Sequence, residues 1–138
     1  MSYLHHEKIL LIEDDEIDAL AVKKAFNDNN ISNELIHISD SENALQYLLD
    51  HNEADIGMIL LDLNMPKMNG VEFLKKRSLS SRIFSIPLFV LTTSNNDSDV
   101  RNCYQLGISG YLVKPVNYKK FKSLIHTVYS FWTNCQLP

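Results

Sequence analysis

Five short, mostly apolar runs recur along the chain, and each is followed by polar or turn-forming residues. The runs cover residues 8–12, 34–38, 58–61, 86–91 and 110–113. Within most of them the apolar residues stand next to one another instead of alternating with polar ones, which is typical of strands buried on both faces. We therefore expect five β-strands.

The segments between these runs carry apolar residues at helical spacing. A helix is expected from Glu16 to about residue 27, where four consecutive polar residues end it. Further helices are expected after the capping residues 39–42, over about residues 71–79, and after residues 95–97. The last helix has the clearest pattern, with its apolar face formed by Phe121, Leu124, Ile125, Val128, Tyr129 and Trp132.

Strands that alternate with helices predict an α/β fold with a doubly wound parallel sheet and helices on both faces. The length of 138 residues matches one ordinary domain, and the sequence has no internal repeat or linker. We expect a folded domain over residues 8–132, an N-terminal tail over residues 1–7 and a C-terminal tail over residues 133–138.

Charge and hydropathy exclude several classes of protein. Thirteen basic and seventeen acidic residues give a net charge of −4, which argues against a dedicated nucleic-acid or anionic-membrane binder. No apolar run is long enough to span a bilayer, and the N terminus lacks the apolar segment of a signal peptide. Cys103 and Cys135 show no metal-binding or redox spacing, so we expect a cytoplasmic protein in which Cys103 is a buried thiol and Cys135 a thiol of the C-terminal tail. The histidines at positions 37, 51 and 126 match no nucleophilic or metal-ligand pattern.

The residues with the most suggestive chemistry stand directly after strands. Glu13 and Asp14 follow the first strand, Asp62 the third, Thr92 the end of the fourth, and Lys114 the fifth. The carboxyl ends of parallel strands share one edge of a sheet, and ligands bind there. Clustered carboxylates repel one another unless a cation compensates them, so Lys114 and a hard divalent ion such as Mg²⁺ are expected at this edge. Asp15 and Glu16 are better explained as acids that stabilise the N terminus of the first helix.

Four segments together resemble the receiver domain of bacterial response regulators, over nearly the whole expected domain. They are residues 11–15, 60–66, 90–93 and 107–115, and each closes its own strand. The resemblance implies a flavodoxin-like fold with strand order 2-1-3-4-5.

The resemblance also implies the chemistry. Asp62 would be the phosphoacceptor, which receives a phosphoryl group from a phosphohistidine of a sensor histidine kinase. Asp14, Asp62 and the backbone carbonyl of Asn64 would bind Mg²⁺ directly, and Glu13 would reach the ion through water. Such a protein is a signalling phosphoacceptor that catalyses only its own phosphotransfer and the hydrolysis of its aspartyl phosphate.

The same resemblance assigns a switch. Lys114 and the Thr92 hydroxyl would each hold a phosphoryl oxygen, and Tyr111 would turn inward when Thr92 moves toward the phosphoryl group. This movement would change the surface formed by the helix after residue 97, the strand at 110–113 and the last helix.

Three further positions have roles implied by the family. Asn64 and Ser94 lie two residues past Asp62 and Thr92, at positions that tune the lifetime of the phosphoryl group. The Lys114–Pro115 bond would be the family's cis peptide, which aims Lys114 at the site.

A finer resemblance concerns residues 91–94, 104–107 and 131–138. These segments are similar to single-domain regulators that partner phytochrome-type histidine kinases, with no output domain. Such a regulator acts by binding, so a homodimer through the last helix and the C-terminal tail is a hypothesis. A generic receiver remains an alternative, as does a constitutive interaction module with a vestigial acidic pocket. A flavodoxin-type carrier is a weaker alternative, because the chain lacks a phosphate-cradling loop after the first strand.

Overall fold

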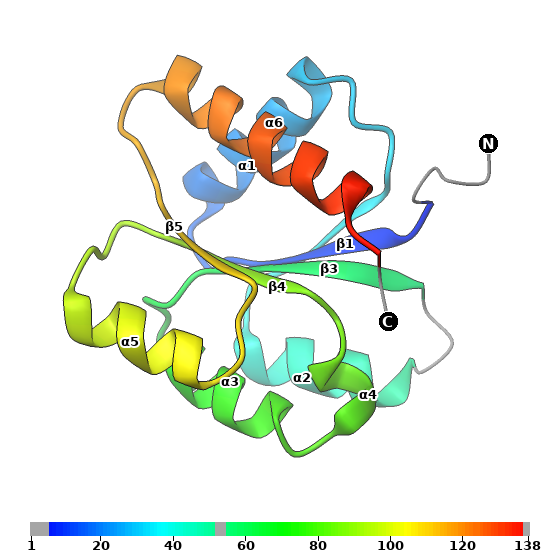
Figure 1. Cartoon of the computed structure of the whole chain (residues 1–138), viewed down its shortest axis with the longest axis vertical. Helices are drawn as coiled ribbons and strands as arrows, with labels where there is room; N and C mark the ends of the chain where they lie inside the picture. The colour runs from blue at the N-terminus through cyan, green and yellow to red at the C-terminus, as the bar shows by residue number, and fades with distance from the viewer. Residues whose placement is uncertain (1–5, 52–54, 137–138) are drawn as a thin grey trace.

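The computed structural model describes residues 6–51 and 55–136, and the strands and helices alternate along them (Figure 1). The elements in chain order are β1 (Lys8–Ile12), α1 (Glu16–Asp28), β2 (Leu35–Ile38), α2 (Ser41–Asp50), β3 (Ile56–Leu61), α3 (Gly70–Arg77), α4 (Ser81–Phe84), β4 (Leu88–Thr92), α5 (Asp97–Gln105), β5 (Gly110–Val113) and α6 (Tyr118–Asn134). The expected tails, residues 1–7 and 133–138, lie partly outside the described residues, and the boundaries of the domain stay a prediction.

The five strands form one parallel sheet in the order β2-β1-β3-β4-β5. The predicted fold class and strand order are therefore confirmed. The three inner strands are almost completely buried, whereas β2 and β5 at the edges are only half-buried. The apolar runs at β1, β3 and β4 follow from this placement, because an inner strand needs apolar side chains on both faces.

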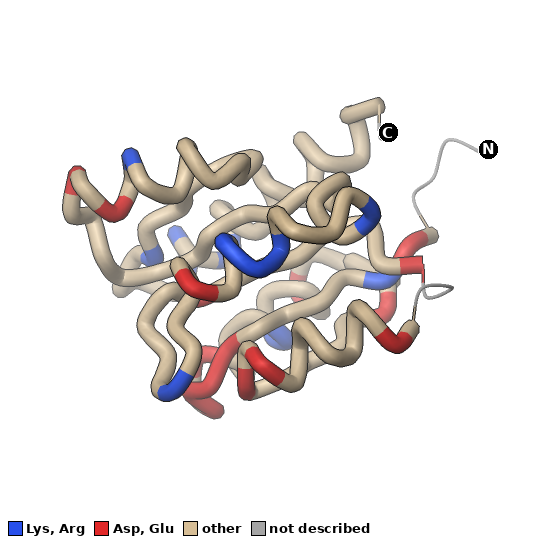
Figure 2. The backbone as a smooth tube through the Cα atoms, turned by 90° about the horizontal axis from the view of Figure 1, so that it is seen from below, with Lys and Arg blue, Asp and Glu red and all other residues tan. Residues whose placement is uncertain are grey.

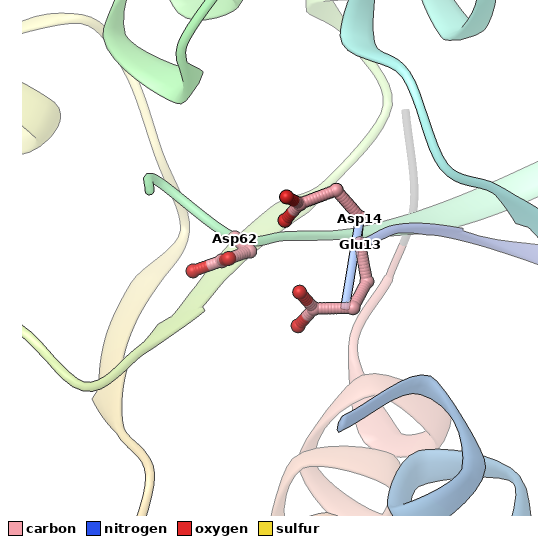
Figure 3. Close-up of side chains that lie close together, drawn as sticks. All are labelled: Glu13, Asp14 and Asp62. Atoms are coloured by element: carbon pink, nitrogen blue, oxygen red, sulfur yellow. The ribbon is translucent and has the colours of Figure 1, made fainter. Parts of the chain in front are cut away.

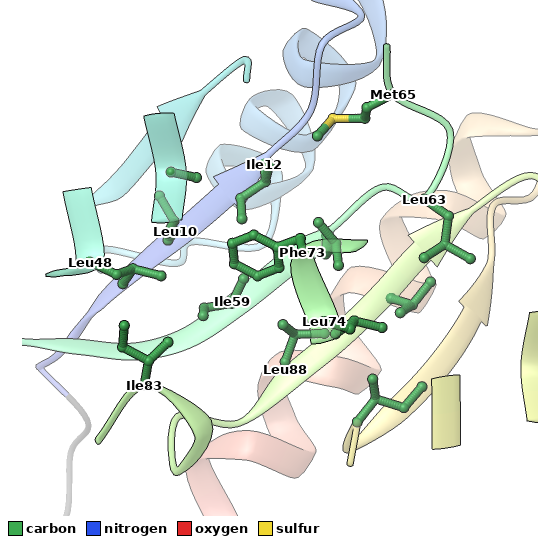
Figure 4. Packing of buried hydrophobic residues seen from close by; sticks show 14 of the residues in the cluster. Leu10, Ile12, Leu48, Ile59, Leu63, Met65, Phe73, Leu74, Ile83 and Leu88 are labelled. Atoms are coloured by element: carbon green, nitrogen blue, oxygen red, sulfur yellow. The ribbon is translucent and has the colours of Figure 1, made fainter. Parts of the chain in front are cut away.

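Successive residues of each inner strand enter two separate cores. Ile9 and Leu11 face the core under α1 and α6, whereas Leu10 and Ile12 face the core on the side of α2, α3 and α5. Figure 1 shows α1 and α6 above the sheet and the other helices below it, and Figure 4 shows the lower core around Phe73. The sheet is covered on both faces, as the pattern of the strands predicted.

The turns after the strands are fixed by helix caps. The Asp15 side chain accepts hydrogen bonds from the backbone N–H groups of Ile17 and Asp18 at the start of α1. Asn69 and Glu72 form a capping box on α3, and Asn117 caps α6. Polar caps therefore set the places where the chain leaves the carboxyl edge of the sheet.

Several local boundaries differ from the prediction; the third strand, for example, begins at Ile56 rather than at residue 58. The helix expected over residues 71–79 ends at Arg77, and a separate one-turn helix, α4, follows it. The fourth strand begins at Leu88 rather than at residue 86, after Pro87, which has no N–H group to donate to the sheet. The Pro87 carbonyl still accepts a hydrogen bond from the N–H group of Ile59.

Trp132 shows how the last helix is held against the sheet. Its side chain is 1% exposed, and its indole N–H donates to the Gly57 carbonyl over 2.9 Å. A Cβ atom at Gly57 would come within 2.8 Å of the indole, so glycine makes room for it. The prediction that Trp132 packs in the core is confirmed, but Phe131 beside it is 57% exposed. No helix within the described part of the chain is long and apolar enough to cross a membrane.

Candidate functional site

Three carboxylates meet at the carboxyl edge of the sheet. Glu13 and Asp14 follow β1 and Asp62 follows β3, and one oxygen of each lies within 4.8 Å of the others. Figure 3 shows the three side chains close together at the ends of two neighbouring strands, and Figure 2 shows several acidic segments on the left of the view and others on the right. Glu13 and Asp62 are buried, whereas Asp14 is exposed, so the group opens to solvent on one side. The sequence-based expectation that these acids converge is confirmed.

The backbone around the acids is held from both sides. The Asp62 N–H group donates to the Ile12 carbonyl over 3.0 Å, which joins the ends of β3 and β1. A ring nitrogen of His37 on β2 lies 2.7 Å from the Glu13 carbonyl oxygen. No pattern along the chain indicates this contact, because it depends on the register of β2 against β1.

Lys114 lies among acids that come from two elements. Its ammonium donates to Glu13 Oε1 over 2.7 Å and to Asp18 Oδ2 over 3.2 Å, and its side chain is 9% exposed. Among the ion pairs of the described residues, Lys114 has no pair with Asp62 within 4.0 Å. Asp18 was not singled out from the sequence, although it lies in the first turn of the helix that directly follows Glu13 and Asp14.

Burial and neighbouring charges shift the pKa values of Glu13, Asp62 and Lys114. Burial raises the pKa of Glu13 to about 7, even though the hydrogen bond from Lys114 opposes the shift. Burial likewise raises the pKa of Asp62, against the attraction of Lys114. Burial by itself lowers the pKa of Lys114, but its hydrogen bond to Glu13 and the neighbouring acids outweigh this, and its pKa is raised. The site is therefore short of positive charge, with one ammonium for three clustered carboxyl groups.

A second group of polar contacts lies at the end of β4. The completely buried Thr92 hydroxyl oxygen lies 3.4 Å from Asn64 Nδ2 and accepts from the Ser94 N–H group over 3.4 Å. The Ser94 hydroxyl donates to Asp99 Oδ2 over 2.8 Å, which ties this loop to α5. Asn64 and Ser94 thus flank the hydroxyl that the sequence placed at the site.

Tyr111 is half-buried and reaches the same loop. Its hydroxyl donates to the Ser94 carbonyl over 2.9 Å, while its backbone N–H group donates to the Tyr104 hydroxyl over 3.1 Å. The ring packs against the lower core. The sequence could not decide this orientation, because it follows from the spacing between α5 and β5.

The prediction that the Lys114–Pro115 peptide bond is cis is wrong. No peptide bond in residues 6–51 and 55–136 is cis, so Lys114–Pro115 is trans. An X–Pro bond favours the trans form by roughly 0.5–1 kcal/mol. Lys114 reaches Glu13 and Asp18 from this trans backbone, whose N–H group donates to the Thr92 carbonyl over 2.7 Å.

The donor set fits a hard divalent cation. Three carboxylates supply oxygen ligands at one point, and the Asn64 carbonyl belongs to the loop that begins at Asp62. Neither thiol contributes to the site, because Cys103 is buried against the lower core and Cys135 ends α6.

Comparison with known proteins agrees with this arrangement. The response regulator receiver domain model matches residues 9–126. The response regulator Rcp1 of Synechocystis is 36% identical over 128 residues, which cover 90% of this chain and 87% of that protein. The probable methanogenesis regulatory protein FilR2 of Methanothrix harundinacea is 34% identical over 90% of this chain and 82% of that protein.

Solved structures extend the similarity to the whole fold. The phosphorylated cyanobacterial phytochrome response regulator RcpA has a TM-score of 0.89 and 30% identity, covering 96% of this chain and 99% of that chain. The Mn²⁺-bound form of Rcp1 has a TM-score of 0.85 and 34% identity, covering 96% and 99% of the two chains.

The fold and the acidic edge therefore define a class, the receiver domains of two-component response regulators. Since the family match spans most of its length, the chain belongs to the response regulator receiver domain family. Its relatives include regulators associated with phytochromes.

Proposed function

We propose that this chain is a phosphorelay switch that accepts a phosphoryl group on Asp62. The observation that carries the proposal is the convergence of Glu13, Asp14 and Asp62 within 4.8 Å, with the Lys114 ammonium bonded to Glu13. A vestigial interaction module would have no reason to keep buried acids, which destabilise the fold when they are uncompensated.

The phosphoryl donor in this proposal is a phosphohistidine of a sensor kinase. An Asp62 carboxylate oxygen attacks the phosphorus, the new O–P bond forms, and the P–N bond breaks. The leaving imidazole nitrogen keeps the electron pair and takes up a proton from solvent. Lys114 and the Thr92 hydroxyl each hold a phosphoryl oxygen through a hydrogen bond.

Asp14, Asp62 and the Asn64 backbone carbonyl are the residues that would hold Mg²⁺, with Glu13 acting through water. When bound, the ion would compensate the negative charge of the phosphoryl oxygens. The carboxylate oxygens at this edge support the proposal because they are the ligands that Mg²⁺ prefers.

The output in this proposal passes through the β4–α5 loop. A phosphoryl group that draws Thr92 toward Asp62 would displace the loop that holds Ser94, and the Tyr111 hydroxyl would lose its present acceptor, the Ser94 carbonyl. The affected surface is formed by α5, β5 and α6, which we call the α5–β5–α6 face. Asn64 and Ser94, which contact the Thr92 hydroxyl, would tune the lifetime of the phosphoryl group.

The partner would be a sensor histidine kinase of the phytochrome type, as the name of the relative RcpA, a cyanobacterial phytochrome response regulator, suggests. The α5–β5–α6 face and the C-terminal tail would bind a second copy of the chain. Val113 and Phe131 support this, because both are apolar and exposed on that face.

Incubation with Mg²⁺ and acetyl phosphate, followed by intact-mass measurement, tests the proposal. We expect one phosphoryl group per chain in the wild type and none in Asp62→Asn. The matched control is Asp50→Asn at the end of α2, far from the acids, which should be phosphorylated like the wild type. A wild-type chain that gains no mass, or an Asp62→Asn variant that gains it equally fast, would show that the proposal is wrong.

A further inference from the structure

Lys114 is held by a carboxylate that lies outside the three-acid cluster. Asp18 stands in the first turn of α1, and its Oδ2 atom lies 3.2 Å from the ammonium. The Asp18 side chain is 44% exposed, whereas Lys114 is 9% exposed. The Asp18 carboxylate is therefore open to solvent on one side and accepts a hydrogen bond from the buried Lys114 ammonium on the other.

The ammonium has three N–H donors, and two of them are already used. One points to Glu13 and one to Asp18, and no ion pair within 4.0 Å joins Lys114 to Asp62 among the described residues. The third N–H group can donate to a phosphoryl oxygen on Asp62, but the ammonium now lies beyond 4.0 Å of Asp62 and bonds to Glu13 and Asp18. Movement toward Asp62 would therefore lengthen at least one of these two bonds. Glu13 is buried with the lysine, so its bond is the harder one to give up.

The position of Asp18 allows Lys114 to give up this hydrogen bond in favour of a phosphoryl oxygen. A pocket of about 270 Å³ is lined by Asp18, Lys114, Thr93 and Val116 among others, so the contact between the two charged groups faces open space. Water in this pocket can solvate the Asp18 carboxylate once the ammonium has moved away.

We propose that Asp18 is a positioning residue that holds Lys114 in the unphosphorylated site and competes with the phosphoryl group for its ammonium. This inference rests on the proposed function of Asp62. It makes the first turn of α1 part of the switch, because the strength of the Lys114–Asp18 bond sets how readily the phosphorylated arrangement forms.

The first measurement uses the metal-free protein. Proton–nitrogen NMR spectra of the lysine ammonium groups should show a protected Lys114 resonance that shifts in Asp18→Asn. The matched control is Glu16→Gln, which removes the same charge from an exposed side chain in the same turn. It should leave the resonance in place.

The second measurement is the affinity for beryllofluoride, a phosphoryl analogue, in the presence of Mg²⁺. We expect Asp18→Asn to bind it about fivefold more tightly than the wild type, which corresponds to a surface pair worth about 1 kcal/mol. Glu16→Gln should stay within about twofold, and Asp18→Glu, which can restore the pair, should return toward the wild-type value.

The outcomes separate the two proposals. A wild type that binds no beryllofluoride overturns the proposed function, and this inference with it. A wild type that binds while Asp18→Asn binds equally or more weakly overturns the inference alone, as does an equal effect of Glu16→Gln. An unchanged Lys114 resonance in Asp18→Asn would show that the resting contact itself is absent.

Discussion

At the scale of single residues, burial raises the pKa of two acids of the site, Glu13 and Asp62. Glu13 is 1% exposed, and its pKa of about 7 lies well above the usual 4.5. The folded protein therefore binds more protons than the unfolded chain between these two values. The stability that the protonated Glu13 carboxyl contributes is fully present below pH 4.5 and is lost as the pH rises toward 7.

This linkage predicts a pH effect on the metal-free protein. The free energy of unfolding should fall from pH 5 to pH 7.5, and Glu13 contributes up to about 3 kcal/mol of the fall. Glu13→Gln should remove that part of the slope, since glutamine does not titrate. Urea unfolding in the presence of a chelator measures both proteins, and equal slopes would contradict the assignment.

At this scale, the sequence predicts which residues form the site better than it predicts the contacts between them. Glu13, Asp14 and Asp62 could be placed together because they end neighbouring strands of a parallel sheet. The partners of Lys114 could not be predicted, because Asp18 contacts it from a helix through its side chain. The trans Lys114–Pro115 bond and the Tyr111 orientation are also tertiary properties, for which a local pattern carries no signal.

At the scale of elements, one buried cation joins the segments below the sheet. Arg77 at the end of α3 is 1% exposed, and its guanidinium donates to the carbonyls of Phe84 and Ile86 over 3.1 Å each. It also reaches the carbonyls of Leu106 and Gly107. Burial lowers its pKa to about 10, so it remains charged at neutral pH. The short helix α4 and the turn before β5 are held by this side chain.

Replacing Arg77 should therefore loosen several elements at once. We expect Arg77→Ala to lower the free energy of unfolding by roughly 2–4 kcal/mol, because buried carbonyls lose their donors. Lys76→Ala, at the exposed neighbouring position, should change it by less than about 0.5 kcal/mol. Chemical denaturation compares the two variants. Similar losses of unfolding free energy would contradict the conclusion that Arg77 holds these elements together.

Helix α4 shows where the pattern along the chain was insufficient. Its single turn, Ser81–Phe84, is too short for an apolar periodicity, and it depends on the Arg77 contact with the Phe84 carbonyl. The long helices were predictable because each presents a full apolar face to the sheet. α6 is the clearest example, with Phe121, Ile125, Val128 and Trp132 all buried.

At the scale of the whole molecule, the sheet brings every proposed working group to one edge, while the α5–β5–α6 face lies beside it. Binding of a second copy to this face is the proposed output. We expect light scattering to show a dimer in the presence of Mg²⁺ and beryllofluoride, and Phe131→Arg to prevent it, because a charge would be buried at the contact. Leu79→Arg, an equally drastic change at an exposed site after α3, is the control. A wild type that stays monomeric, or equal effects of both variants, would contradict this output.

The most direct test of the central claim is to identify the residue that carries the phosphoryl group. Borohydride reduces an aspartyl phosphate to homoserine, which peptide mass spectrometry locates in the sequence. After phosphotransfer from a histidine kinase, we expect homoserine at position 62 in the wild type and at no position in the chain that was not exposed to the kinase. Homoserine at another position, or none anywhere after transfer, would contradict the assignment of Asp62 as the phosphoacceptor.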